Sequence, residues 1–381
     1  MARFVGKITT ILAAAALTAC VTGQKPPSAP ALGLADIAAR LPPETGDRDG
    51  WARDLAAALK AIDKAPTAER VCASVAVIEQ ESRFHADPAV PGLPRLVRAE
   101  LERRLAPLGP LAGPALHVLL AGSAPGETAS FGQRLDRVRS EHDLDRLYRD
   151  VAAVYQDGYP GPFALASGLS RLLGHGALED LNPITTVGAM QVKVDYARKL
   201  PEMRDLEVSD VRESLYTRKG GVRAGVARLL DYPAGYDDVV YRFADYNAGA
   251  YTSRNAAFQA MLAELTGQPL ALDGDLLAYQ PNGEPQSADS KTLHALLTFG
   301  RQHGDWDWRI RHEARAEKSA DFEATAIYRE VRDAWEKQTG KKASYARLPE
   351  ITVSSPKMPR PRTTAWFAES VKRHYDACRA R

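Results

Sequence analysis

Apolar residues recur with helical spacing from about Trp51 to about residue 267, and this periodicity restricts the possible folds more than any other feature. No run of alternating apolar and polar residues predicts a sheet. Residues 291–338 and 365–380 carry further helical patterns, whereas 267–290 are rich in Gly, Pro, Asp, Gln and Ser and predict a loop. We therefore expect a mainly α protein.

Composition narrows the classes of protein without selecting one. The 381 residues suffice for a large core, and 45% hydrophobic with 26% charged residues is ordinary for a globular chain. The 50 basic and 48 acidic residues leave a formal charge of +2, so we expect no nucleic-acid partner. The eight His residues form no HxxxH or HExxH pattern, so we expect no metal and no other cofactor.

The N-terminus has the pattern of a secretory signal. Basic Arg3 and Lys7 precede an apolar stretch, Ile8 to Ala19, which is too short to span a bilayer as a helix. The stretch ends in Leu17-Thr18-Ala19-Cys20, which resembles a bacterial lipobox. The resemblance implies that 1–19 are removed and that Cys20 is lipidated, which would attach the chain to a membrane.

Residues 20–45 are rich in Pro, Ala and Gly and predict a lipid-anchored linker. Val21, in place of Asp, follows the lipobox Cys. By similarity to Gram-negative lipoproteins, this favours the periplasmic face of the outer membrane. An ordinary signal peptide with an incidental Cys is the alternative.

Two further cysteines, Cys72 and Cys378, are far apart in the sequence. An oxidising periplasm would permit a disulfide between them, and such a bond would tie the C-terminus to the helix that precedes Glu81. Two separate buried thiols are the alternative.

A single carboxyl side chain stands out in the helix predicted over Thr67 to Phe84. Glu81 shares a stripe with apolar Val77 and Phe84, whereas Glu79 lies about 200° away around the helix axis. Burial against apolar groups raises the pKa of a carboxyl, which lets it donate a proton near neutral pH. We therefore predict Glu81 as a general acid and keep Glu79 as the second choice. A salt bridge from Glu81 to an Arg is the non-catalytic alternative.

Two later stretches offer groups that suit a sugar ligand, and we expect them on helical segments. The first is Gly188-Ala189-Met190-Gln191, in which Gln191 supplies a hydrogen-bond donor and an acceptor and Met190 an apolar wall. The second is Ala244-Asp245-Tyr246-Asn247-Ala248-Gly249, in which Tyr246 supplies a flat ring. As alternatives, Gln191 caps a helix, Met190 is core, and Tyr246 and Asn247 form a buried hydrogen-bonded pair.

With Glu81-Ser82, these stretches resemble the Glu-Ser, Gly-Leu-Met-Gln and Ala-Tyr-Asn-Ala-Gly motifs of soluble lytic transglycosylases and goose-type lysozymes. The resemblance covers about 67–267 and implies a lysozyme-like α fold that binds peptidoglycan glycan strands. It implies Glu81 as the single general acid/base. It implies glycan contacts for Gln191 and Tyr246. From their residue types we also predict substrate contacts for Ser82, Gly188, Met190 and Asn247. In lytic transglycosylases the substrate's acetamido group assists, and the MurNAc-GlcNAc β-1,4 bond is replaced by a 1,6-anhydro ring.

The spacing departs from the typical domain, because Glu81 and Gln191 stand 110 positions apart. This predicts a lysozyme-like domain over 46–267 with a helical insertion at 88–180. The charged run from Arg134 to Glu141 predicts a solvated face. Residues 268–381 predict a C-terminal helical extension with an extended Pro-rich segment at 351–364.

Two alternative functions stay open. One is a noncatalytic peptidoglycan-binding or scaffolding lipoprotein on the same fold, because an insertion can occlude a glycan groove. The other is hydrolysis, as in goose-type lysozymes. The whole pattern, lipobox included, also resembles an uncharacterised family of proteobacterial lipoproteins.

Overall fold

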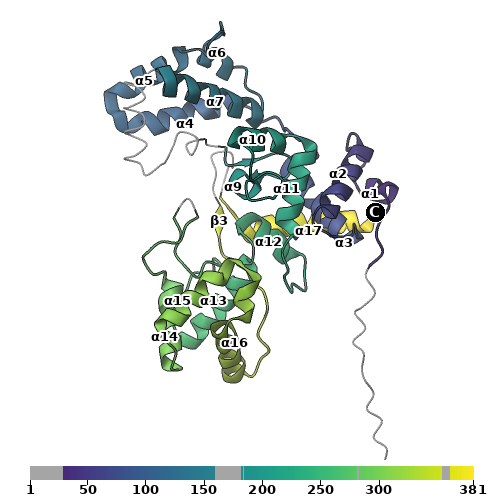
Figure 1. Cartoon of the computed structure of the whole chain (residues 1–381), viewed down its shortest axis with the longest axis vertical. Helices are drawn as coiled ribbons and strands as arrows, with labels where there is room; N and C mark the ends of the chain where they lie inside the picture. Colours follow the sequence, from purple (N-terminus) through teal and green to yellow (C-terminus); the bar gives the residue numbers. More distant parts are fainter. Residues whose placement is uncertain (1–28, 159–181, 183, 281–282, 354–360) are drawn as a thin grey trace, which may run out of the picture.

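The computed structural model describes residues 29–158, 182, 184–280, 283–353 and 361–381 and is mainly helical, as predicted (Figure 1). In chain order the helices are α1 (Leu34–Ala39), α2 (Arg48–Lys60), α3 (Ala68–Ser82), α4 (Leu93–Leu105), η1 (Ala106–Leu111), α5 (Ala112–Ala121), α6 (Phe131–Leu135), α7 (Glu141–Gly158), α9 (Val194–Ala197), α10 (Val208–Tyr216), α11 (Arg218–Leu230), α12 (Val240–Ala248), α13 (Thr252–Thr266), α14 (Lys291–Gln302), α15 (Asp307–Ala314), η3 (Arg315–Lys318), η4 (Ala320–Ala324), α16 (Ala326–Thr339) and α17 (Thr364–Ala380). Two antiparallel hairpins complete the described part, β1 (Thr186–Val187) with β2 (Val192–Lys193) and β3 (Thr352–Val353) with β4 (Arg362–Thr363).

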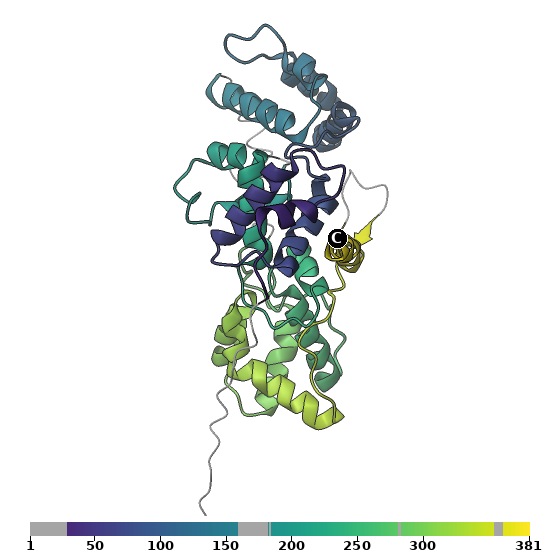
Figure 2. The same ribbon diagram turned by 90° about the vertical axis from the view of Figure 1, so that its right-hand side faces the viewer.

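A first hydrophobic core lies at the centre of the molecule and extends into α4, α6 and α7 at one end, while α13–α16 lie at the other end (Figures 1 and 2). Helix α3 forms its middle, with eight consecutive residues, 71–78, buried. The helix begins as predicted, because the Thr67 side chain accepts a hydrogen bond from the backbone N–H of Arg70. The last helix, α17, packs on α3 and α12.

The C-terminus is joined covalently to the core. Cys72 on α3 and Cys378 on α17 form a disulfide, and both residues are fully buried. Polar contacts on the same interface add to it, since Ser370 donates to the Gln80 side chain at 2.8 Å and His374 lies 3.1 Å from the Glu79 carboxylate. The disulfide therefore closes a loop that includes nearly the whole folded chain.

Removing this disulfide should lower the free energy of unfolding of the whole protein. We expect Cys378→Ser to lower the free energy of unfolding by about 2–5 kcal/mol, because the unfolded chain gains the freedom of a very long loop. Urea denaturation of the variant and of the wild type, each with and without a reducing agent, measures the effect. Reduction should lower the stability of the wild type and leave the variant unchanged; equal stability of both oxidised proteins would contradict the prediction.

The predicted insertion forms a helical lobe, α4–α7, as far as the described residues reach (Figure 1). The segment before α4 pairs with the segment between α6 and α7: the N–H of Val90 donates to the carbonyl oxygen of Arg139 at 2.8 Å, and Ala89 forms a β-bridge with Ser140. Consequently, α7 begins beside the residues that follow α3. The region 159–181 of the predicted insertion lies outside the described residues.

The linker predicted over 20–45 is wrong at its C-terminal end. Helix α1 packs on α2, and Ile37 and Leu41 are fully buried at helical spacing. The N–H of Leu32 also donates to the carbonyl oxygen of Pro66. These apolar positions are few and stand among Pro and Ala, so the composition of the segment hid them. Residues 1–28, with the predicted signal peptide and Cys20, lie outside the described part.

The boundary predicted at 267/268 does not separate the two cores. A second core forms around α13, whose Phe258, Met261 and Leu262 pack with α14 and α16. Thus α13 leaves the first core, and α17, predicted in the extension, belongs to it. The predicted Pro-rich segment is extended at its described edge, since Arg362 lies in β4, while 354–360 are outside the description. No helix within the described ranges is long and apolar enough to cross a membrane.

Candidate acidic site

Glu81 lies on the last turn of α3, where the helix ends beside the two left-handed residues Arg83 and Phe84. Its side chain is half-buried. Across the described part of the chain, its carboxyl group has no hydrogen-bond or salt-bridge partner, so the predicted alternative of an Arg salt bridge finds no support there. Burial raises the pKa of Glu81 from 4.5 to about 7; Arg228 opposes this rise and Glu141 adds to it. A partly accessible carboxyl with this pKa can donate a proton near neutral pH.

Glu79, the second choice, faces the opposite way. Its Oε1 atom lies 3.1 Å from Nδ1 of His374 on α17. The helix geometry expected from the sequence therefore separates the two carboxyls: Glu79 serves the α3–α17 interface, and Glu81 faces α11 and α12.

The Gly188–Gln191 stretch is not helical, contrary to prediction. It is the turn between β1 and β2, with β-branched Thr186, Val187 and Val192 pairing on its two sides. The turn needs φ of +78° at Gly188 and +49° at Gln191. Gly188 is buried, and a Cβ there would lie 2.1 Å from the carbonyl oxygen of Leu215.

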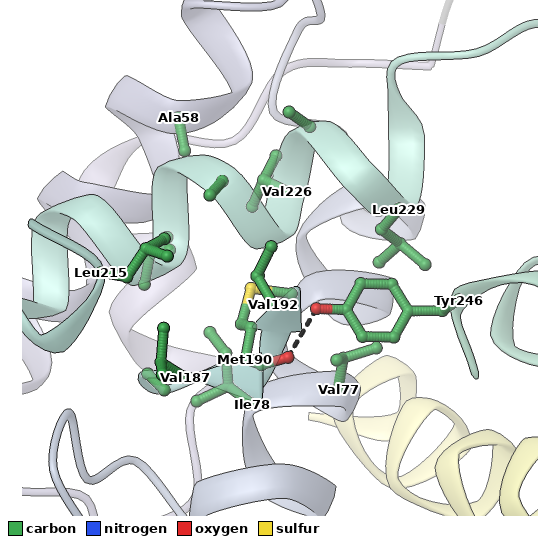
Figure 3. Close-up of a cluster of buried hydrophobic side chains, with 14 of the residues drawn as sticks. Ala58, Val77, Ile78, Val187, Met190, Val192, Leu215, Val226, Leu229 and Tyr246 are labelled. Carbon is green, nitrogen blue, oxygen red and sulfur yellow. Dashed lines mark hydrogen bonds between the residues drawn. The ribbon is translucent and has the colours of Figure 1, made fainter. Parts of the chain in front are cut away.

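Met190 is also buried completely, and a Cβ on Gly225 of α11 would lie 2.2 Å from its sulfur atom. We therefore correct the roles predicted for Gly188 and Met190. Both let the turn pack against α10 and α11, and neither forms an accessible wall for a substrate. The core alternative for Met190 is the one that holds (Figure 3).

The Gln191 side chain is half-buried, and both its amide oxygen and its amide nitrogen form hydrogen bonds. Its Oε1 accepts a hydrogen bond from Thr186 Oγ1 at 3.0 Å, and its Nε2 donates to the Gly188 carbonyl oxygen and to Glu141 Oε2, each at 3.3 Å. The predicted alternative of a helix cap is wrong, because no helix begins or ends at this side chain. Gln191 instead joins the turn to the start of α7.

Tyr246 lies on α12 and is only 4% exposed. Its hydroxyl donates to the carbonyl oxygen of Met190 at 2.6 Å, and Figure 3 shows the ring crossing toward the turn. Arg228 on α11 donates to the Tyr246 carbonyl oxygen through Nε and Nη2, at 3.0 and 2.7 Å. Tyr246 therefore holds the turn through Met190, and its burial corrects the prediction that its ring faces a sugar.

The remaining predicted contacts also have partners inside the protein. Ser82 is 6% exposed and its Oγ donates to the Ile78 carbonyl oxygen at 3.1 Å. Asn247 Oδ1 accepts from Thr364 Oγ1 at 3.0 Å, which connects α12 to the start of α17. The hydrogen bonds of Ser82 and Asn247 therefore go to other parts of the protein and not to the Glu81 carboxyl. Both residues stabilise the helices around Glu81.

Two residues near Glu81 were missed by sequence reasoning. Glu141 is 6% exposed, so the solvated face predicted for its segment is wrong at this position. Arg228 is the cation whose charge opposes the raised pKa of Glu81. Glu141 carried one local signal, because Ser140 precedes an acidic first turn and thereby marks the start of a helix. Arg228 carried no such signal.

The site offers a proton donor, an amide and a cation. No cluster of three His, Cys, Asp or Glu side chains able to hold a metal ion occurs among the residues that the structure describes. Two surface hollows, one beside α1 and one between α13 and α16, are lined by other residues than Glu81.

The fold and the site define a mainly helical protein with a disulfide between α3 and α17 and a half-buried acidic side chain, Glu81. The chain belongs to the family described as protein of unknown function DUF1615, whose model matches residues 44–381. That match includes α4–α7 and the C-terminal helices, so both are part of the family's own architecture. The chain is also similar to the uncharacterized protein YaiW of Escherichia coli (strain K12). The two are 37% identical over 340 residues, which cover 89% of this chain and 87% of the relative. No solved structure matches the chain.

Proposed function

We propose that this protein cleaves peptidoglycan glycan strands as a lytic transglycosylase, with Glu81 as the general acid/base. The observation that carries the proposal is the Glu81 carboxyl itself. It is half-buried, has no partner in the described structure, and has a pKa raised to about 7. The ordered resemblance of Glu81-Ser82, the Gly188–Gln191 turn and the Tyr246-Asn247 pair to lytic transglycosylase motifs supports the substrate class.

In the proposed reaction, protonated Glu81 donates its proton to the oxygen that leaves the MurNAc C1 carbon as the glycosidic bond breaks. The substrate's acetamido group stabilises the positive charge at C1. The C6 hydroxyl of the same sugar then bonds to C1 and gives its proton to the Glu81 carboxylate, which restores the acid. The step consumes no water, and the product carries a 1,6-anhydro ring.

Purified sacculi test the proposal directly. Wild-type protein should release soluble fragments whose MurNAc ends are anhydro by mass spectrometry. Products with reducing ends would identify a hydrolase of the goose lysozyme type in place of the lyase. Absence of any soluble product from sacculi that a known muramidase digests would contradict the enzyme proposal.

A noncatalytic peptidoglycan-binding or scaffolding role is the second candidate, and one observation favours it. Met190 and Tyr246, which would supply apolar and aromatic sugar contacts, are both buried. Cosedimentation of the protein with sacculi, without soluble products, would favour this function.

We also propose that the chain is a lipoprotein anchored through Cys20 at the periplasmic face of the outer membrane. The variant Cys20→Ala should lose incorporation of labelled palmitate and leave the membrane fraction, because the acceptor thiol is absent. Cys378→Ser is the matched control and should keep the label. Labelling that persists in Cys20→Ala would reject the lipobox.

A further inference from the structure

The inserted lobe brings a second carboxylate to the Glu81 site. The segment before α7 pairs with the chain that follows α3: the N–H of Val90 donates to the carbonyl oxygen of Arg139, and Ser140 Oγ donates to Asp87 at 2.8 Å. The first residue of α7, Glu141, therefore emerges beside the chain that leaves α3. Glu141 and Glu81, although far apart in the sequence, therefore interact electrostatically in the fold.

Helix α7 is held firmly at this place by buried polar contacts. Asp145 is fully buried and accepts hydrogen bonds from Arg212 on α10 at 2.7 Å and from Asn182 at 2.6 Å. One turn earlier, His142 Nε2 lies 2.8 Å from the Glu213 carboxylate, and the His142 ring stacks on Tyr216. These contacts fix the position of Glu141, because side chains on either side of α7 must move if the helix shifts.

Glu141 in turn fixes the Gln191 amide. The two Nε2 hydrogens of Gln191 go to Glu141 and to the Gly188 carbonyl oxygen, so the amide has no donor left. Its Oε1 accepts one bond from Thr186 and retains a second lone pair. A ligand at this half-buried side chain would therefore meet an acceptor, which suits a sugar hydroxyl or an amide N–H.

We infer that Glu141 is a positioning residue of the Glu81 site: it orients the Gln191 amide as an acceptor and places a fixed negative charge toward Glu81. The inference deepens the proposed function and rests on it for the substrate. It assigns the inserted lobe a part in the site, beyond covering a groove.

The charges around the two carboxyls set the direction of the effect. Glu81 faces Arg228 from α11, Glu141 from α7 and the hydroxyl of Tyr246 from α12. Glu141 faces Tyr216 on α10, beside a cluster of charged groups. The members of that cluster are Asp87, His142, Asp145, Arg212 and Glu213. Glu141 raises the pKa of Glu81 and Arg228 lowers it, so loss of the Glu141 charge should lower that pKa.

Titration of the full-length protein labelled with ¹³Cδ glutamate tests this without any substrate. The Glu81 resonance is assigned as the one missing in Glu81→Gln. In Glu141→Gln its midpoint should fall by roughly half a unit to one unit, because a like charge is removed. Glu141→Asp, which keeps the charge, should stay near wild type, and Glu141→Ala, which also removes the charge, takes the place of Glu141→Gln if that variant unfolds. An unchanged midpoint in folded Glu141→Gln would overturn the inference.

Activity on sacculi provides the second readout. In Glu141→Gln the alkaline limb of the pH–rate profile should move to lower pH by the same amount. Asp150→Asn on α7, whose carboxylate pairs with Arg134, is the control and should leave the profile unchanged. If the Glu81 midpoint shifts although wild type releases no product from sacculi, the proposed reaction fails while the positioning role of Glu141 stands. If wild type releases product and the Glu81 midpoint does not shift in Glu141→Gln, the proposed reaction stands while the positioning role of Glu141 fails.

Discussion

Replacing Glu81 by Gln is expected to reduce the release of anhydromuropeptides from sacculi by at least about 100-fold, since general acid catalysis typically contributes 10²–10⁴. Glutamine keeps the size and polarity of the side chain and removes the transferable proton. The pH dependence of the wild type should agree, with activity lost as the pH rises through about 7 and Glu81 ionises. Mass spectrometry of the soluble products measures both effects.

The same substitution should stabilise the protein at alkaline pH. The folded state holds the Glu81 proton more tightly than the unfolded chain, because its pKa is raised from 4.5 to about 7. Stability therefore falls as pH rises between these values, and the full cost, up to about 3 kcal/mol, is present above pH 7. Glu81→Gln should relieve this cost in urea denaturation at pH 8 and show little difference from wild type at pH 4.

Glu79→Gln is the matched control, because Glu79 lies on the same helix and faces His374 on α17. It should keep activity near the wild-type level. If Glu81→Gln retains full activity, or if both variants lose activity equally, the role proposed for Glu81 is wrong.

Gly188→Ala is expected to destabilise the protein by about 2–4 kcal/mol, the second large effect. The new Cβ would lie 2.1 Å from the carbonyl oxygen of Leu215, and φ at this position is +78°. Because the turn also carries Gln191, the variant should lose activity at temperatures where it remains folded. Thermal and urea unfolding, with the sacculus assay, measure the two losses.

Gly267→Ala separates backbone strain from steric clash. Gly267 has a similar φ of +66°, yet a Cβ there would meet nothing within 4 Å. It should cost only about 1 kcal/mol, from the positive φ alone. Equal losses for the two variants would show that the contact with Leu215 contributes nothing.

Local sequence patterns predicted the elements that depend on near neighbours. The helix carrying Glu81 begins at Thr67 and separates Glu81 from Glu79, as spacing along one helix requires. The Gly188–Gln191 turn was misassigned, because a two-residue strand on each side is too short to show alternation. Glu141 was missed because burial of a charged residue depends on what packs over it, and its partner Gln191 is 50 positions away.

The sequence by itself determined a mainly helical chain, one carboxyl placed among apolar neighbours, and a pair of cysteines able to join. These features follow from residue type and from spacing within single helices. The tertiary structure alone decided that Cys72 meets Cys378, that Tyr246 and Met190 face inward, and that the lobe returns Glu141 to Gln191. Contacts between segments distant in the chain depend on packing and charge in three dimensions, and no local pattern records them.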